Sequence, residues 1–174
     1  MVANGIFTSK LIYVMPVWQG CEEYLIDALQ VCQNKAARLV NKLDRFTPIK
    51  VLLNQCGWLS VKQLMIYHSL ILLHKIFQSK KPTFLYQKIT SGPPLPNTRQ
   101  SVATNKALAD SGLFSQPAAP ICQLSLTRKS WSWAAVHWYC QLPPVLRSET
   151  NIRKFKTRLK DWVSKNVENL LEVD

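Results

Sequence analysis

The sequence is poor in acidic residues. Its 174 residues include 10 Asp and Glu against 22 Lys and Arg, a formal net charge of +12 at pH 7, and no two aspartates are adjacent. Polymerases and nucleases hold divalent metal ions with two or more carboxylates. We therefore expect that the chain is not an enzyme on its own, and predict no catalytic residue. A metal-dependent nuclease that uses Asp44 or Asp161 is the weakest alternative.

Glycine and cysteine are also scarce. The five glycines are isolated, so the glycine-rich motifs that bind phosphate in nucleotide sites do not occur. The five cysteines are odd in number and scattered, with no Cys-x-x-Cys. A zinc site needs two pairs of closely spaced ligands, and His137 with Cys140 makes a single pair. The sequence therefore predicts no metal site, no cofactor and no small-molecule substrate.

No signal peptide and no long hydrophobic run are visible. The longest apolar tract, residues 64–77, is interrupted by His68, His74 and Lys75, and a membrane span needs about 20 residues. The first residues lack a basic segment followed by an apolar core and a cleavage site. Scattered, odd-numbered cysteines favour a reducing compartment. We expect an intracellular chain, nuclear or cytoplasmic, that is neither secreted nor bound to a membrane.

What the sequence does have is helical periodicity. Over residues 22–43 apolar residues recur every three or four positions, and we expect this stripe to dock against a helix over 60–79. Its members are Leu25, Ile26, Leu29, Cys32, Ala36, Leu39, Val40 and Leu43. Thr47 and Pro48 predict the start of a helix that ends at Gly57. Ser60 and Gln63 predict a capping box at the start of the next helix, which is apolar on almost every side.

The second half of the chain is less regular. Residues 91–121 are rich in Pro, Ser and Thr, and short strands can form near 84–89 and 123–127. Helices return over 131–142 and from about residue 150. The sequence thus predicts a mainly α fold: a thumb-like helical bundle over 1–90, an irregular connection over 91–130 with room for a short β-hairpin, and a C-terminal segment over 131–174. The amphipathic last helix of that segment docks on the bundle.

Basic residues form a column of four cations on the same helix as the apolar stripe, on a different side. The column consists of Lys35, Arg38, Lys42 and Arg45. Between Lys35 and Lys106 twelve cations face a single anion, Asp44. A block of one sign favours a polyanionic partner, either nucleic acid or an anionic membrane surface, although a merely solvated face is the alternative. Neighbouring amides suit phosphate and sugar contacts, which hold a nucleic acid without reading its sequence. These amides are Gln30, Gln33, Asn34 and Asn41.

Other candidate side chains fit a core better than a site. Trp58, Trp138 and Trp162 stand at periodic apolar positions, so packing is expected rather than base stacking; Trp133 is the exposed exception. His68 and His74 lie on the apolar helix. We interpret both as hydrogen-bonded core or boundary histidines, and Cys56 as a small hydrophobic residue.

An ordered set of motifs resembles a known family. Residues 3–13 (ANGIFTSKLIY), 29–38 (LQVCQNKAAR), 55–63 (QCGWLSVKQ) and 155–162 (FKTRLKDW) occur in that order, with Thr47-Pro48 between the second and third. Trp138 and Leu142-Pro143 belong to the closing motif, in which Tyr139 stands where an asparagine is typical. Together they resemble the region after the catalytic palm in reverse transcriptases of non-LTR (LINE-type, jockey-like) retrotransposons. The resemblance spans most of the chain and is thinnest over 91–128.

The resemblance implies a part of an RNA-directed DNA polymerase. This chain would supply the thumb and the C-terminal region, and the fingers, the palm with its aspartate pair and the endonuclease would lie upstream. A helical thumb grips a template–primer duplex or an RNA/DNA hybrid through its backbone, here with Lys35, Arg38, Lys42 and Arg45. The alternative is a helical protein-interaction or structural module whose basic charge only keeps it soluble.

Overall fold

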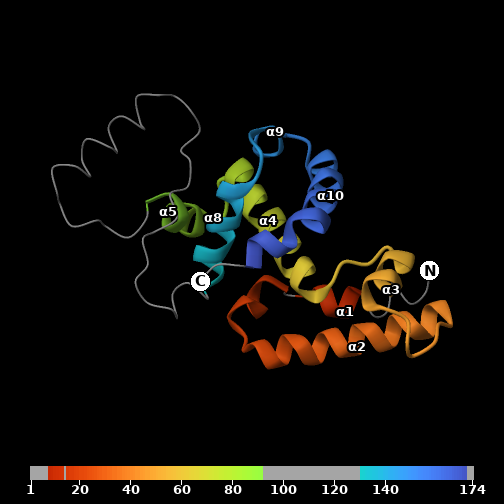
Figure 1. The fold of residues 1–174 in the computed structure, drawn as a ribbon. Helices are drawn as coiled ribbons and strands as arrows, with labels where there is room; N and C mark the ends of the chain where they lie inside the picture. The colour runs from red at the N-terminus through yellow and green to blue at the C-terminus, as the bar shows by residue number, and fades with distance from the viewer. Residues whose placement is uncertain (1–7, 14, 92–129, 172–174) are drawn as a thin grey trace. The chain divides into compact units, whose positions relative to one another are not determined.

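The computed structural model describes residues 8–13, 15–91 and 130–171 (Figure 1), and every regular element in these ranges is a helix. The predicted mainly α fold is confirmed. In chain order the elements are α1 (Ser9–Ile12), the 3₁₀ helix η2 (Met15–Gly20), α2 (Glu23–Asn41), α3 (Ile49–Cys56), α4 (Val61–Ser79), α5 (Thr83–Ser91), α8 (Trp131–Gln141), α9 (Pro144–Arg147) and α10 (Ile152–Leu171).

The strand considered near residues 84–89 is wrong, because this stretch is helix α5. Pro82 begins it: the carbonyl of Pro82 accepts hydrogen bonds from the N–H groups of Leu85 and Tyr86, both at 3.1 Å. Phe84 is exposed, whereas Ile89 is buried and Leu85 and Tyr86 are half-buried. That spacing of three and four residues is the helical period and not the alternation of a strand. The second stretch considered, 123–127, lies outside the described residues.

Two compact units make up the chain, and α4 and α10 pass through both. Unit 1 comprises residues 1–69 and 156–174, and unit 2 comprises residues 70–155. No single helix in the described ranges is long and apolar enough to cross a membrane. The pair α3 and α4 passes a test of length and hydropathy only when the two are joined across a 46° bend, as a buried core helix also would.

Unit 1 is built around α2, α3 and the beginning of α4. One buried cluster joins α1, η2, α2 and α4 through Leu11, Met15, Ile26, Leu59, Val61, Leu64 and Met65. A second joins α2 to α3 through Ala37, Leu52 and Leu53. On α10, Leu159 and Val163 are buried and the Lys160 ammonium donates to the carbonyl of Gly57 at 3.0 Å.

Local signals in unit 1 set the ends of its helices. Gly57 ends α3 with φ +64°, a left-handed conformation that glycine adopts without strain. The capping box is confirmed, since the Ser60 N–H donates to Gln63 Oε1 at 2.9 Å and the Gln63 N–H donates to Ser60 Oγ at 3.3 Å. The predicted Thr47 cap is wrong. Pro48 has an extended ψ of 138° and is itself the N-cap, so Thr47 is one residue too early to cap.

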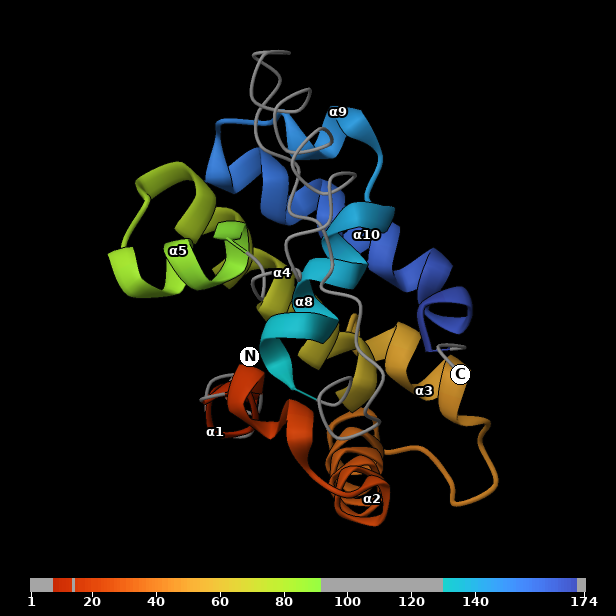
Figure 2. The same cartoon turned by 90° about the vertical axis from the view of Figure 1, so that its left-hand side faces the viewer.

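Unit 2 is built around the second part of α4, with α5 and α8 beside it (Figures 1 and 2). Phe77 of α4 makes ring contacts with Tyr86 of α5 and Tyr139 of α8, at centroid distances of 6.3 and 5.2 Å. Ala135 and Trp138 of α8 are buried, which confirms the predicted packing of Trp138. Helix α8 ends before Pro143, also as predicted.

Candidate nucleic-acid interface

The four cations of the predicted column do not all lie on one helix, because α2 ends at Asn41 and Lys42 and Arg45 follow it. Lys35 and Arg38 are helical, and Lys42 is the C-cap in a left-handed conformation, with its N–H bonded to the Arg38 carbonyl. Arg45 lies in the turn that follows, where its backbone N–H donates to Asp44 Oδ1 at 2.6 Å. Lys35, Lys42 and Arg45 are exposed and Arg38 is half-buried. Positive side chains at the C-terminal end of a helix also suit its dipole.

Three of the four cations line one open hollow. Lys35, Arg38 and Lys42 surround it together with Leu39 and Leu43, and Arg45 is not part of its lining. Nε of Arg38 is buried without a hydrogen-bond partner. The two leucines were not predicted as part of the interface. Their sequence positions were the available signal. Leu39 is four residues after Lys35, and residues four apart share a helix face. Leu43 directly follows Lys42. The hollow thus combines three cations with an apolar floor.

The amides of α2 make hydrogen bonds within unit 1, and their predicted contacts with phosphate and sugar stay a prediction. Gln33 is 2% exposed, Asn34 is also buried, and Gln30 and Asn41 are half-buried. Gln33 Nε2 donates to the carbonyl of Leu59 at 2.8 Å. Gln30 Nε2 donates to the side-chain oxygens of Gln33 and Asn34, each at 2.9 Å. All of these bonds stay within unit 1 and hold α2 in place.

The same amides complete the start of α4. The first N–H groups of a helix have no partner inside it. Gln30 Oε1 accepts a bond from the Val61 N–H at 2.8 Å, beside the two bonds of the capping box. At the other end of α2, Asn41 Nδ2 contacts Cys56 Sγ at 3.0 Å. The amides are therefore structural, and their cost in desolvation is offset by bonds to backbone groups that need them.

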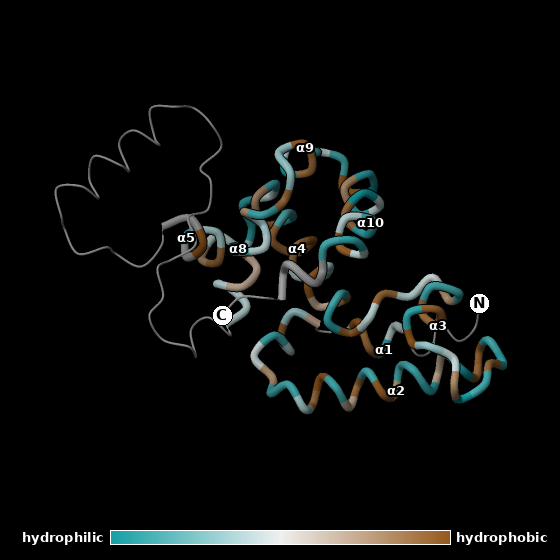
Figure 3. Tube along the Cα trace, in the orientation of Figure 1, coloured by the Kyte–Doolittle hydropathy of each residue, from teal (hydrophilic) through white to brown (hydrophobic). Residues whose placement is uncertain are grey.

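The predicted docking of the apolar stripe of α2 on α4 is confirmed at Ile26 and Leu29, which pack with Val61, Leu64 and Met65, and is wrong for the four stripe residues that are exposed. Leu39 is 81% exposed, and Leu25, Cys32 and Val40 are exposed as well. Of the stripe only Ile26 is fully buried, and α2 otherwise buries Gln33, Asn34 and Ala37. Figure 3 shows hydrophobic and hydrophilic residues alternating along the whole of α2. The helix thus packs through a mixed face and leaves apolar side chains beside the cation column.

His74 is a buried, hydrogen-bonded histidine, as predicted. Its ring is 2% exposed and stacks on Phe155 with a centroid distance of 3.8 Å and an angle of 6°. Nε2 lies 2.9 Å from both the carbonyl of Glu149 and Nε2 of Gln78, and Nδ1 lies 3.2 Å from the Tyr139 hydroxyl. Burial lowers the pKa of His74, against a smaller opposing effect of Glu149. Neutral His74 therefore has a structural role.

The remaining candidates are also engaged locally. His68 is half-buried and contacts the ring of Tyr67 at 5.2 Å, but its buried Nε2 has no hydrogen-bond partner, so the predicted hydrogen bonding is not found at this atom. Burial together with the nearby charge of Lys156 lowers its pKa. Trp133, expected to be exposed, is half-buried and stacks on His137 at 5.0 Å. Asp44 and Asp161 are exposed. In the ranges that the structure describes, no three His, Cys, Asp or Glu side chains gather as a metal site would require.

Comparison with known proteins adds no relative: no family model, no curated protein and no solved structure matches this chain. The likeness to non-LTR reverse transcriptases therefore stays a prediction that rests on the motifs alone. What the structure contributes is the position of those motifs. Residues 29–38 form the middle of α2, and residues 55–63 connect α3 to α4.

Proposed function

We propose that this chain is the nucleic-acid-gripping, non-catalytic thumb and C-terminal module of a retrotransposon reverse transcriptase, an RNA-directed DNA polymerase. It holds a template–primer duplex or an RNA/DNA hybrid through phosphate contacts. The observation that carries the proposal is the cation column, of which Lys35, Arg38 and Lys42 lie around one hollow and Arg45 follows in the next turn. The acid-poor block from Lys35 onward and the order of the motifs support it. The polymerase's palm and fingers are its proposed protein partners.

The test is the salt dependence of duplex binding. Each phosphate neutralised contributes about −0.9 to the slope of log affinity against log salt, so four contacts predict a slope of about −3.6. The variant Lys35→Gln, Arg38→Gln, Lys42→Gln, Arg45→Gln keeps much of the aliphatic stems and removes the charges. It should weaken binding and flatten the slope towards zero, measured by fluorescence polarisation with DNA, RNA and hybrid duplexes.

A matched control separates a specific surface from net charge. The variant Lys10→Gln, Lys75→Gln, Lys81→Gln, Lys154→Gln also loses four charges, all at exposed positions outside the column. It should keep most of the slope. If the two variants lower the salt-dependence slope by the same amount, or if the column variant keeps the wild-type slope, the column does not hold the duplex and the proposal is wrong.

A second candidate function is a helical protein-interaction module, and the exposed apolar face of α2 favours it. Tyr24 is 70% exposed and Val31 52%, in addition to Leu39. The variant Leu25→Gln, Leu39→Gln removes apolar surface without changing charge. Binding of a protein partner that this variant abolishes, in a chain that shows no affinity for duplex at low salt, would establish this function in place of the first.

A further inference from the structure

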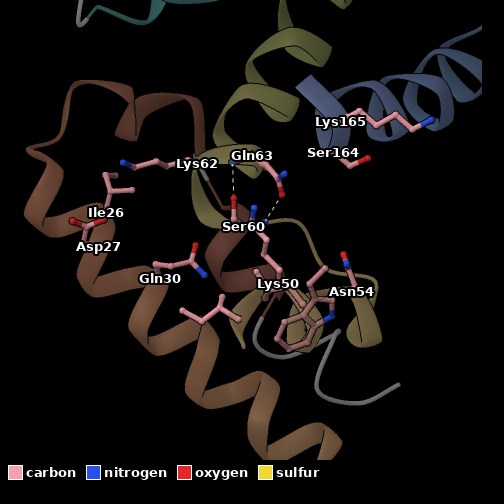
Figure 4. Close-up of a pocket in the computed structure, with 13 residues that line it drawn as sticks. Ile26, Asp27, Gln30, Lys50, Asn54, Ser60, Lys62, Gln63, Ser164 and Lys165 are labelled. Atoms are coloured by element: carbon pink, nitrogen blue, oxygen red, sulfur yellow. Dashed lines mark hydrogen bonds between the residues drawn. The ribbon is translucent and has the colours of Figure 1, made fainter. Parts of the chain in front are cut away.

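A cavity of about 540 Å³ lies in unit 1 between α2, α3, the start of α4 and α10. Figure 4 shows residues of all four helices around it, with Lys50 and Asn54 on α3 and Ser164 and Lys165 on α10. Its volume is within the 300–1,000 Å³ range of small-molecule sites. The cavity is separate from the hollow at the cation column, since the two share no lining residue.

One wall of the cavity is held rigidly before any ligand arrives. The segment 57–61, between α3 and α4, is tied to three other parts of unit 1 by four hydrogen bonds. These join the Trp58 N–H to Leu53 O at 2.9 Å, Lys160 Nζ to Gly57 O at 3.0 Å, Gln33 Nε2 to Leu59 O at 2.8 Å, and the Val61 N–H to Gln30 Oε1 at 2.8 Å. A segment fixed at nearly every residue loses little entropy on binding.

The rigid segment carries an indole at the cavity. Trp58 is half-buried: it packs against the cluster of Ala37, Leu52 and Leu53, and it also lines the cavity. Ile26 and Ile49 add apolar surface to the lining. An aromatic side chain held from one side offers the rest of its surface to a flat apolar group.

The charge of the lining is positive. It contains three lysines, Lys50, Lys62 and Lys165, against one acid, Asp27. Lys62 Nζ is paired with Glu23 Oε1 at 2.6 Å. Lys50 and Lys165 come from α3 and α10 and are exposed. Two cations from different elements make the lining positive, which suits an anionic group such as phosphate.

We infer that this cavity binds one nucleoside phosphate, with the base against Trp58, the phosphate near Lys50, and Lys165 adding to the positive charge of the lining. Base stacking on an aromatic side chain tolerates every base, so we expect this site to bind a nucleotide without preference for its base. Where the nucleoside phosphate is the unpaired end of a bound strand, the inference rests on the proposed function. A free nucleotide has the same chemistry, and the experiment separates the two sources.

The experiment compares a blunt duplex with the same duplex carrying one unpaired terminal nucleotide. Stacking of one base is worth about 1–3 kcal/mol, so the overhang should tighten binding by about five- to 150-fold at fixed salt. The variant Lys50→Gln, Lys165→Gln should lose most of the gain in affinity that the overhang gives over the blunt duplex. Its control, Lys75→Gln with Lys154→Gln, loses the same charge at exposed positions outside the lining and should keep the ratio.

An independent readout locates the ligand. In ¹H–¹⁵N spectra the indole signal of Trp58 is assigned by its loss in Trp58→Phe, and it should shift on addition of overhang duplex or of a nucleoside monophosphate. If column-dependent duplex binding is present but the overhang adds nothing and the Trp58 signal does not move, the inference fails and the proposed function stands. If no duplex binds, the proposed function fails, and a millimolar monophosphate that leaves the Trp58 signal unmoved then overturns the inference too.

Discussion

The two units bury polar side chains of different kinds. Unit 1 buries the amides of Gln33 and Asn34, and unit 2 buries the imidazole of His74. Both kinds bond to backbone carbonyls, at Leu59 in unit 1 and at Glu149 in unit 2. An amide keeps the same charge at every pH, whereas a histidine changes its charge near neutrality. The comparison predicts two units that both depend on buried polar bonds but respond differently to acid.

The largest expected effect is that of removing the imidazole. His74→Ala leaves a cavity beside Phe155 and removes the hydrogen-bond partner of the buried Tyr139 hydroxyl. Together these should lower the free energy of unfolding by about 3–4 kcal/mol, measured by urea denaturation with near-ultraviolet circular dichroism. Tyr139→Phe is the control, because it removes only the hydroxyl that contacts His74 Nδ1. It should lower the free energy of unfolding by about 1 kcal/mol. A loss below about 1 kcal/mol for His74→Ala would contradict the structural role.

The amide network of unit 1 should be somewhat less costly to break. Gln33→Leu keeps the volume but leaves the Leu59 carbonyl and one Gln30 donor without this partner. We expect a loss of about 2 kcal/mol, from buried groups left unpaired. The matched change Leu39→Gln, on the exposed face of the same helix, serves as the control. If Gln33→Leu is neutral or stabilising, the amides do not hold α2.

Acid should distinguish the two networks. Burial lowers the pKa of folded His74 below its ordinary value of about 6.5, so the unfolded chain binds a proton first as pH falls. The contribution of His74 to stability is complete above about pH 6.5 and declines as pH drops from there to the folded pKa. His68 and His137 shift in the same direction.

The test is the urea midpoint at pH 7.5 and at pH 5.5. Wild type should lose stability at the lower pH, Gln33→Leu should lose the same amount, and His74→Phe should lose less. An equal loss in His74→Phe would assign the acid sensitivity to the other histidines or to carboxylates.

Tyr139 makes stability depend on pH in the opposite direction, at alkaline pH. Burial raises the pKa of Tyr139 to about 12, so its contribution to stability is complete below about pH 10 and is lost as pH rises towards 12.

The smallest expected effect is on the exposed face of α2. Leu39→Gln and Leu25→Gln change side chains that contribute little to the packed interior, so each should alter the free energy of unfolding by less than about 0.5 kcal/mol. Thermal unfolding followed by circular dichroism is sufficient. A loss above about 1.5 kcal/mol would mean that the stripe is buried after all, and that the original docking prediction was right.

Much of the local structure followed from the sequence. The boundaries of α2 and α4 were predicted to within about two residues, and Gly57 and the Ser60–Gln63 capping box were placed correctly, because period and capping chemistry act over a few neighbouring residues. The stretch 84–89 was harder, since short apolar runs suit strand and helix alike. The leucines beside the column were missed although they are close to it in the sequence. The cavity at Trp58 was not predicted because it brings together residues distant in the chain.

Helical periodicity was sufficient to predict that α2 is a helix, with cations at spacings of three and four residues. Which face of α2 is buried depends on packing between segments that are distant in the sequence. The hydrophobic pattern favoured Leu25, Leu39 and Val40, but the segment before α4 places backbone groups against α2 that need partners. Each buried group left without a bond costs about 1–3 kcal/mol, about as much as burying a leucine gains. With several such groups at one contact, the amide face packs inward and the leucines remain in water.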